Sequence, residues 1–183
     1  MPEENVGWSI PIYLDASAAV KLFVNEDGSV RLEDFIGRKW AAHLHITEFA
    51  FYETLGVFKK KLLRAELDRD RYFNIIAEIT GSVEEREIEI DSSFRPDSFH
   101  HFADIYELAA KHSLDWSDAL QVYTVLKGKW AGFRYESTAM FITADQALAN
   151  AAKLEGLRVW NPVKEDQPPD DPDPSLDKPE GRE

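Results

Sequence analysis

The sequence has 183 residues and contains no cysteine, which excludes both a disulfide framework and a metal site built from thiolates. The absence of cysteine suits a reducing cytoplasm. No apolar run approaches the roughly 18 residues of a membrane span. The acidic N-terminus also lacks the basic start and apolar core of a secretory signal. We therefore expect a soluble, cytoplasmic protein that does not associate with a membrane.

Positive charge is also scarce, because 21 lysines and arginines stand against 34 acidic residues, giving a net charge of −13. Such a charge repels nucleic acid, so RNA binding would require a local basic patch or cations held at an acidic site. Apolar residues are plentiful: 44% of the chain is hydrophobic and 12% is aromatic. This composition is typical of one globular domain with a sizeable core.

The end of the chain differs in composition from its body. Residues 164–183 contain five prolines and eight acidic residues, and Leu176 is the only large apolar residue among them. Such a segment cannot bury enough surface to offset the entropy lost on ordering. We expect an N-terminal extension over 1–9, one domain over 10–163, and a disordered, acidic, proline-rich tail over 164–183.

Within the body, strand-like and helix-like segments alternate. The predicted strands are 10–14, 40–46, 86–90, 139–143 and 157–160. The predicted helices are 16–26, 30–37 with Ser29 as cap, 48–64 with Thr47 as cap, 66–80 ended by Gly81, 97–112, 115–127 and 144–155. This alternation predicts a three-layer α/β/α domain, with a central, mainly parallel sheet of four or five strands and helices on both faces. Ligands of such sheets bind outside the carboxyl ends of the strands.

Two acidic residues follow predicted strands directly. Asp15 ends the strand in IYLDASAAV and is followed by small residues. Asp145 repeats this context after AMFIT. Thr143 and Gln146 have the spacing of a capping box, so Asp145 could instead be a first-turn residue that complements the helix dipole.

Two further carboxylates lie in helices. Asp118 is in the first turn of the apolar helix in LDWSDALQVYTVL, and Asp115 is the predicted N-cap. Glu53 has apolar neighbours in its helix, where an ionised side chain costs several kcal/mol unless it is paired or bound to a cation. An exposed Glu on one edge of the helix is the alternative. Carboxylates held close together repel one another, and oxygen ligands suit Mg²⁺ or Mn²⁺. One or two such ions can activate water for an in-line displacement at phosphorus.

Four motifs in order resemble the PIN domain of VapC-type toxins: YLDASAAVKLF, TEFAFYETL, LDWSDALQVYTVL and FITADQALANAAKLEGLRVWNP. The resemblance covers about residues 10–162. It implies an endoribonuclease that depends on Mg²⁺ or Mn²⁺. It also implies catalytic and metal-binding roles for Asp15, Glu53, Asp118 and Asp145, with Ser17, Thr143 and Asp115 in support.

The resemblance also implies partners, namely an RNA substrate, an antitoxin protein that blocks the acidic pocket, and a second copy of the chain in a homodimer. Two basic segments are candidate RNA contacts: Lys59, Lys60, Lys61 and Arg64 in the first, and Lys129 and Trp130 in the second. A solvated charged helix face is the alternative for the first segment. Packing of Trp130 in the core or against another subunit is the alternative for the second.

Two other functions are compatible with the same sheet. One is a non-catalytic PIN-like module that binds RNA or a protein partner, although such a module would have no need of Glu53. The other is a haloacid-dehalogenase-like phosphatase. That family has a second Asp two residues after the strand-end Asp, and this chain has Ser17 there.

Overall fold

In the computed structural model, the described residues are 11–38, 43–94, 99–131 and 139–169. Within them, five strands form one sheet in the order β3-β2-β1-β4-β5, and every neighbouring pair is parallel. The strands are β1 (Pro11–Leu14), β2 (His43–Thr47), β3 (Ile88–Asp91), β4 (Met140–Ile142) and β5 (Arg158–Trp160). The expectation of an extension over 1–9 lies outside the described residues.

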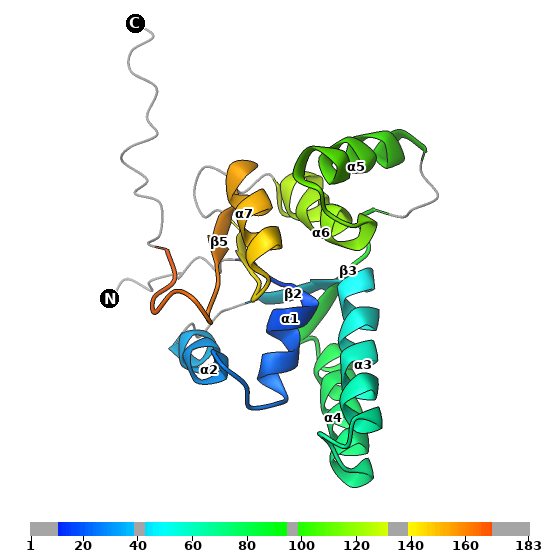
Figure 1. Ribbon diagram of the computed structural model, residues 1–183, viewed down its shortest axis with the longest axis vertical. Helices are drawn as coiled ribbons and strands as arrows, with labels where there is room; N and C mark the ends of the chain where they lie inside the picture. Colours follow the sequence, from blue (N-terminus) through cyan, green and yellow to red (C-terminus); the bar gives the residue numbers. More distant parts are fainter. Residues whose placement is uncertain (1–10, 39–42, 95–98, 132–138, 170–183) are drawn as a thin grey trace, which may run out of the picture.

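Helices cover both faces of this sheet, and the predicted three-layer architecture is therefore confirmed (Figure 1). In Figure 1, α5, α6 and α7 lie above the strands, and α1 to α4 lie below them. The helices are α1 (Ala16–Ala19), the 3₁₀ turn η1 (Val20–Leu22), α2 (Ser29–Arg38), α3 (Glu48–Leu63), α4 (Arg69–Glu84), α5 (Phe99–His112), α6 (Trp116–Lys127) and α7 (Gln146–Leu154).

The side-chain alternation of the strands builds two cores. Tyr13 and Phe141 are buried with apolar residues of α5, α6 and α7 on one face. Ile12, Leu14 and Ile142 are buried with residues of α1, α2 and α3 on the other. Because successive strand residues point to opposite faces, strands with apolar residues at every position must be covered on both sides.

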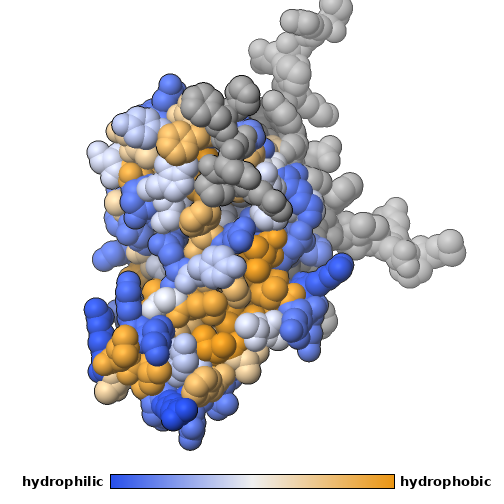
Figure 2. Space-filling model, turned by 90° about the vertical axis from the view of Figure 1, so that its right-hand side faces the viewer, coloured by the Kyte–Doolittle hydropathy of each residue, from blue (hydrophilic) through white to orange (hydrophobic). Residues whose placement is uncertain are grey.

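Helices α3 and α4 form a hairpin that extends beyond the sheet and has a small core of its own. Val20, Phe58, Ile75 and Ile79 are buried in this core. The outer surface of the hairpin carries exposed apolar side chains as well as charged ones, including Tyr52, Leu63 and Phe73. Figure 2 shows hydrophobic residues gathered over the middle and lower part of this face, beside hydrophilic ones.

Four predicted helix ends differ from the structure, each for a local reason. The helix expected over 16–26 ends at Leu22, and the Ser29 hydroxyl accepts from the Glu26 amide and donates to the Val24 carbonyl instead of capping α2. Helix α4 starts after Asp68, whose carboxylate accepts from the Arg71 amide. It also continues past Gly81, because the left-handed residue that follows this helix is Arg86, with φ of 62°.

Residues 164–169, which we expected to belong to the tail, lie against the domain. The Glu165 carboxylate pairs with Lys153, and Asp166 lies 2.8 Å from the Arg31 guanidinium. The Pro169 carbonyl accepts from Arg158 at 2.6 Å. These acids therefore meet basic partners on the body, and the rest of the predicted tail, 170–183, lies outside the described residues. Among the helices of the described segments, none is long and apolar enough to cross a membrane.

The strand order places a switch point beside β1. The chain runs outward from β1 through β2 to β3 on one side, and continues through β4 to β5 on the other. Connections that leave neighbouring strands in opposite directions create a crevice at the carboxyl ends of those strands. In this protein the crevice lies after β1 and β4, where Asp15 and Asp145 follow.

Candidate active site

Asp15 is held in one orientation at the end of β1. Its side chain is 5% exposed and caps α1. The Oδ2 atom accepts hydrogen bonds from the Ser17 amide at 3.2 Å, the Ser17 hydroxyl at 2.5 Å and the Thr143 hydroxyl at 2.8 Å. Oδ1 accepts no hydrogen bond from the described residues, so it is the oxygen of Asp15 available to a ligand.

The hydroxyls of Ser17 and Thr143 connect the ends of β1 and β4. Ser17 Oγ accepts from the Ala144 amide at 2.8 Å, and Thr143 Oγ1 accepts from the Asp145 amide at 3.0 Å. Because each hydroxyl also donates to Asp15, the two residues fix the acids of two strand ends relative to each other. Their supporting role in a metal site stays a prediction.

Asp145 is the N-cap of α7, and its Oδ1 accepts from the Leu148 amide at 2.9 Å. The predicted capping box is therefore wrong. The Thr143 hydroxyl is directed to Asp15, and Gln146 instead donates to Asn150 at 2.9 Å. Asp145 itself is exposed to solvent, beyond the carboxyl end of β4.

The other acids are brought together by α3 and α6. Asp115 caps α6, as predicted, and its Oδ1 accepts from the Asp118 amide at 2.9 Å. Ser117 Oγ lies 3.0 Å from Asp115 Oδ1 and 3.2 Å from Glu53 Oε1, and can donate its single proton to either. Ser117 was not among the predicted site residues; its signal in the sequence is its place in the first turn of the helix, two residues after the cap.

The carboxylates of the cluster come from four elements of the fold and interact electrostatically. Burial, and to a smaller extent the charges of Asp115, Asp15, Glu53 and Asp145, together raise the pKa of Asp118 to about 7. Burial also raises the pKa of Glu53, with smaller opposing effects from Ser117 and Lys60 and reinforcing effects from Asp15 and Asp115. Glu53 is exposed on α3 and not enclosed by apolar residues, which agrees with the alternative of an exposed Glu on one helix edge.

We tested whether these residues fit a divalent cation. Their donors are carboxylate oxygens, which suit a hard ion, and the Oδ1 atom of Asp15 accepts no hydrogen bond from the described residues. Within the described part of the chain, no three acidic or imidazole side chains are arranged to hold a metal ion directly. The cluster therefore fits a cation by its chemistry, and binding one would require side chains to turn inward.

The candidate RNA contacts on α3 differ in their surroundings. Lys61 is held 2.5 Å from Glu26 and 3.2 Å from Glu66, and Arg64 lies 3.9 Å from Glu66. Lys59 and Lys60 are exposed, and neither forms an ion pair with another described residue. The Lys59 ammonium instead lies 5.8 Å from the centre of the Tyr72 ring.

The second candidate segment is engaged elsewhere. Lys129 lies 2.5 Å from Glu89 and 4.9 Å from the centre of the Trp130 ring. Trp130 packs against the core beside the buried ring of His45, at 5.2 Å between ring centres. These contacts favour the packing alternative for Trp130 over base stacking.

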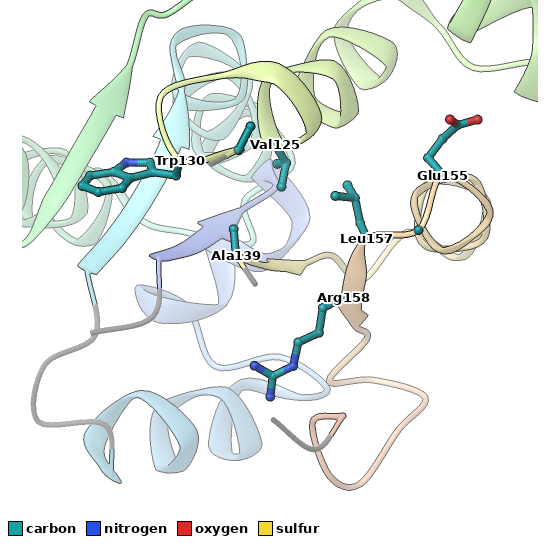
Figure 3. Close-up of a pocket in the computed structure, with 8 residues that line it drawn as sticks. Val125, Trp130, Ala139, Glu155, Leu157 and Arg158 are labelled. Atoms are coloured by element: carbon teal, nitrogen blue, oxygen red, sulfur yellow. The ribbon is translucent and has the colours of Figure 1, made fainter. Parts of the chain in front are cut away.

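A cavity of about 230 Å³ lies at the opposite, amino-terminal ends of the strands, near the beginnings of β4 and β5 (Figure 3). In the figure the Trp130 ring and the Arg158 side chain lie on either side of Ala139. The lining residues are Val125, Trp130, Ala131, Ala139, Glu155, Gly156, Leu157 and Arg158. None of the acids of the cluster lines this cavity, so it is a separate feature.

Comparison with known proteins adds a family and a fold. A family model described as "PIN domain" matches residues 12–154. The crystal structure of PAE2754 from Pyrobaculum aerophilum is similar with a TM-score of 0.52 and 17% sequence identity, covering 82% of this chain and 89% of that one. No curated protein matches the chain. At this identity the structural likeness concerns the fold alone.

Proposed function

Because the chain belongs to the PIN-domain family, whose members are generally nucleases, we propose that it is a divalent-metal-dependent endoribonuclease that hydrolyses RNA phosphodiester bonds. The observation that carries this proposal is the convergence of Asp15, Glu53, Asp118 and Asp145 from four elements. Their mutual effect on the pKa of Asp118 supports a site that is completed by positive charge.

The four carboxylates would hold Mg²⁺ or Mn²⁺. When bound, the ion would supply positive charge at the scissile phosphate and acidify the attacking water. Ser17 and Thr143 keep Asp15 in place, so that its Oδ1 is presented without loss of side-chain entropy during the reaction. The Ser117 hydroxyl, near the start of α6, can donate its proton to Glu53 on α3 or to Asp115, the N-cap of its own helix.

We further propose that the protein is the VapC-like toxin of a toxin–antitoxin pair, acting in the cytoplasm as a homodimer. The acidic cluster supports this proposal, because a basic segment of an antitoxin would complement its charge. The lack of cysteine supports a reducing location. Co-purification with a basic partner protein tests the antitoxin pairing. The growth arrest expected on expression of the chain alone tests the toxin role.

Cleavage of a mixed, structured RNA by the purified protein tests the enzymatic proposal. We expect cuts with Mn²⁺ or Mg²⁺, none with chelator, and about 100-fold slower cleavage by Asp15→Asn. Asp70→Asn, the same chemical change in the first turn of α4, is the matched control and should cleave normally. Equal cleavage by Asp15→Asn would assign the activity to a contaminant.

One observation favours a second candidate, a non-catalytic module that binds RNA or protein. No three acidic or imidazole side chains of the described segments are arranged to hold an ion in the present conformation. In this case RNA binding would persist while cleavage and any metal-induced rise in melting temperature would both be absent. These three measurements on the same purified protein distinguish the ribonuclease from the non-catalytic module.

A further inference from the structure

Gly56 lies in the middle of α3, where glycine is the poorest helix former after proline. A Cβ atom built at this position would meet nothing within 4 Å. By contrast, Gly28 has φ of 89°, and a Cβ there would lie 2.9 Å from the Pro162 carbonyl oxygen. The fold therefore accounts for Gly28, but neither packing against described residues nor backbone conformation accounts for Gly56.

The place of Gly56 on the helix suggests a different reason. It follows Glu53 by three residues and precedes Lys60 by four, so the three lie on one side of α3, within about 10 Å along its axis. Lys60 lowers the pKa of Glu53, which places the two charges within electrostatic reach. Tyr52, 62% exposed, precedes Gly56 by one turn. We call Tyr52, Glu53, Gly56, Lys59 and Lys60 the α3 ridge.

We propose that the α3 ridge guides the RNA strand into the acidic cluster. The sugar-phosphate backbone passes over Gly56 against the helix, the Lys60 ammonium pairs with a phosphate next to the scissile one, and the Tyr52 ring stacks on a base. This inference rests on the proposed ribonuclease function. A side chain at position 56 would hold the strand away from both Glu53 and Lys60.

Charge favours RNA over a protein segment as the occupant. On a chain of net charge −13, Lys59 and Lys60 form no ion pair within the described segments, although Lys61 on the same helix is paired with two acids. A cation beside the carboxylates, as Lys60 is beside Glu53, matches a polyanion whose scissile phosphate reaches the cluster. An amphipathic protein helix would instead need an apolar stripe where the ridge has lysines.

Gly56→Ala tests the proposal, with Gly81→Ala in α4 as the matched control. Gly81 also lies within a helix, and a Cβ there likewise meets nothing within 4 Å. Both variants should raise the melting temperature by about 2–4 °C, because alanine is the better helix former. Only Gly56→Ala should weaken RNA binding in chelator and slow cleavage, each by about 10-fold.

Lys60→Gln tests the phosphate contact independently. It should reduce the slope of log Kd against log salt concentration by about 0.7, as expected for one phosphate contact on a single strand. Lys111→Gln is its control, because Lys111 pairs with Glu155, the C-cap of α7, and is not on the ridge. An unchanged slope for Lys60→Gln would remove Lys60 from the RNA path.

Three results would contradict the proposal that the α3 ridge guides the RNA strand. The first is wild-type RNA affinity and cleavage in Gly56→Ala, and the second is a lower melting temperature, which would show that the fold itself needs the glycine. The third is an altered oligomeric state by light scattering with unchanged RNA affinity, which would assign the ridge to contact between copies. If the wild type cleaves no RNA, the ribonuclease proposal fails. The affinity measurements in chelator would still show whether the α3 ridge binds RNA.

Discussion

At the scale of single residues, Asp15 and Asp118 show two ways of keeping a carboxylate inside a cluster of like charges. Asp15 is nearly buried, and its Oδ2 is stabilised by three hydrogen-bond donors. Asp118 is half-buried, and burial and four neighbouring acids raise its pKa to about 7. The unfavourable free energy of holding these carboxylates close together is therefore seen most clearly in the raised pKa of Asp118.

Asp118→Asn should stabilise the metal-free protein above pH 7. The folded protein retains the Asp118 proton up to about pH 7, whereas the unfolded chain loses it near pH 4, so wild-type stability falls as pH rises between these values. Asparagine removes that loss, which we put at about 1–2 kcal/mol after solvent screening. Urea unfolding in chelator should show a larger gain at pH 8 than at pH 5, where only part of the loss has developed. A variant less stable than wild type at pH 8 would contradict this account.

At the scale of elements, an ion network fixes α3 beside the chain that follows η1. Glu26 lies 3.2 Å from Lys21 and 2.5 Å from Lys61, and Lys21 is 5% exposed. Burial raises the pKa of Glu26, but the hydrogen bonds from Lys61 and Lys21 outweigh burial and lower it. The network joins the segment after Asp15 to the helix that carries Glu53.

Glu26→Gln should lower the free energy of unfolding by about 2–3 kcal/mol, because it leaves the buried Lys21 without its anionic partner. Glu78→Gln is the control, since Glu78 and its partner Arg71 have side chains that are 48% and 45% exposed. An exposed pair of this kind contributes about 0–1 kcal/mol. Equal losses in urea unfolding for the two variants would show that the network adds nothing to stability.

At the scale of the whole molecule, the acidic cluster belongs to a chain that already carries a net charge of −13. A cation that binds the folded state at the cluster removes local repulsion and stabilises the protein by mass action. The ligand carboxylates must be ionised, so binding competes with protons at Asp118.

Mn²⁺ should therefore raise the melting temperature at pH 8 by about 5–10 °C when present at 100 times its Kd. The rise should be smaller at pH 5.5, where Asp118 is protonated, and smaller in Asp15→Asn at either pH. Differential scanning fluorimetry with and without chelator measures both effects. Equal rises for wild type and Asp15→Asn would place the bound ion elsewhere.

The sequence alone was enough to predict the α/β/α layering, the parallel sheet and the caps at Thr47 and Asp115. These features depend on periodicity and on side chains within about four residues, which a linear reading contains. The same reading placed Asp15 at a strand end, because a buried run stops there. It misjudged the ends of α1 and α4, where a 3₁₀ turn and a left-handed arginine decide the boundary.

Only the tertiary structure decided which of these residues act on one another. Thr143 reaches Asp15 across 128 positions of the chain, Ser117 reaches Glu53 across 64, and Lys61 turns to Glu26 away from solvent. The raised pKa of Asp118 and the open side of Gly56 are also properties of the folded chain. Burial, charge coupling and open space arise from contacts between distant segments, and these contacts exist only once the sheet has set their positions.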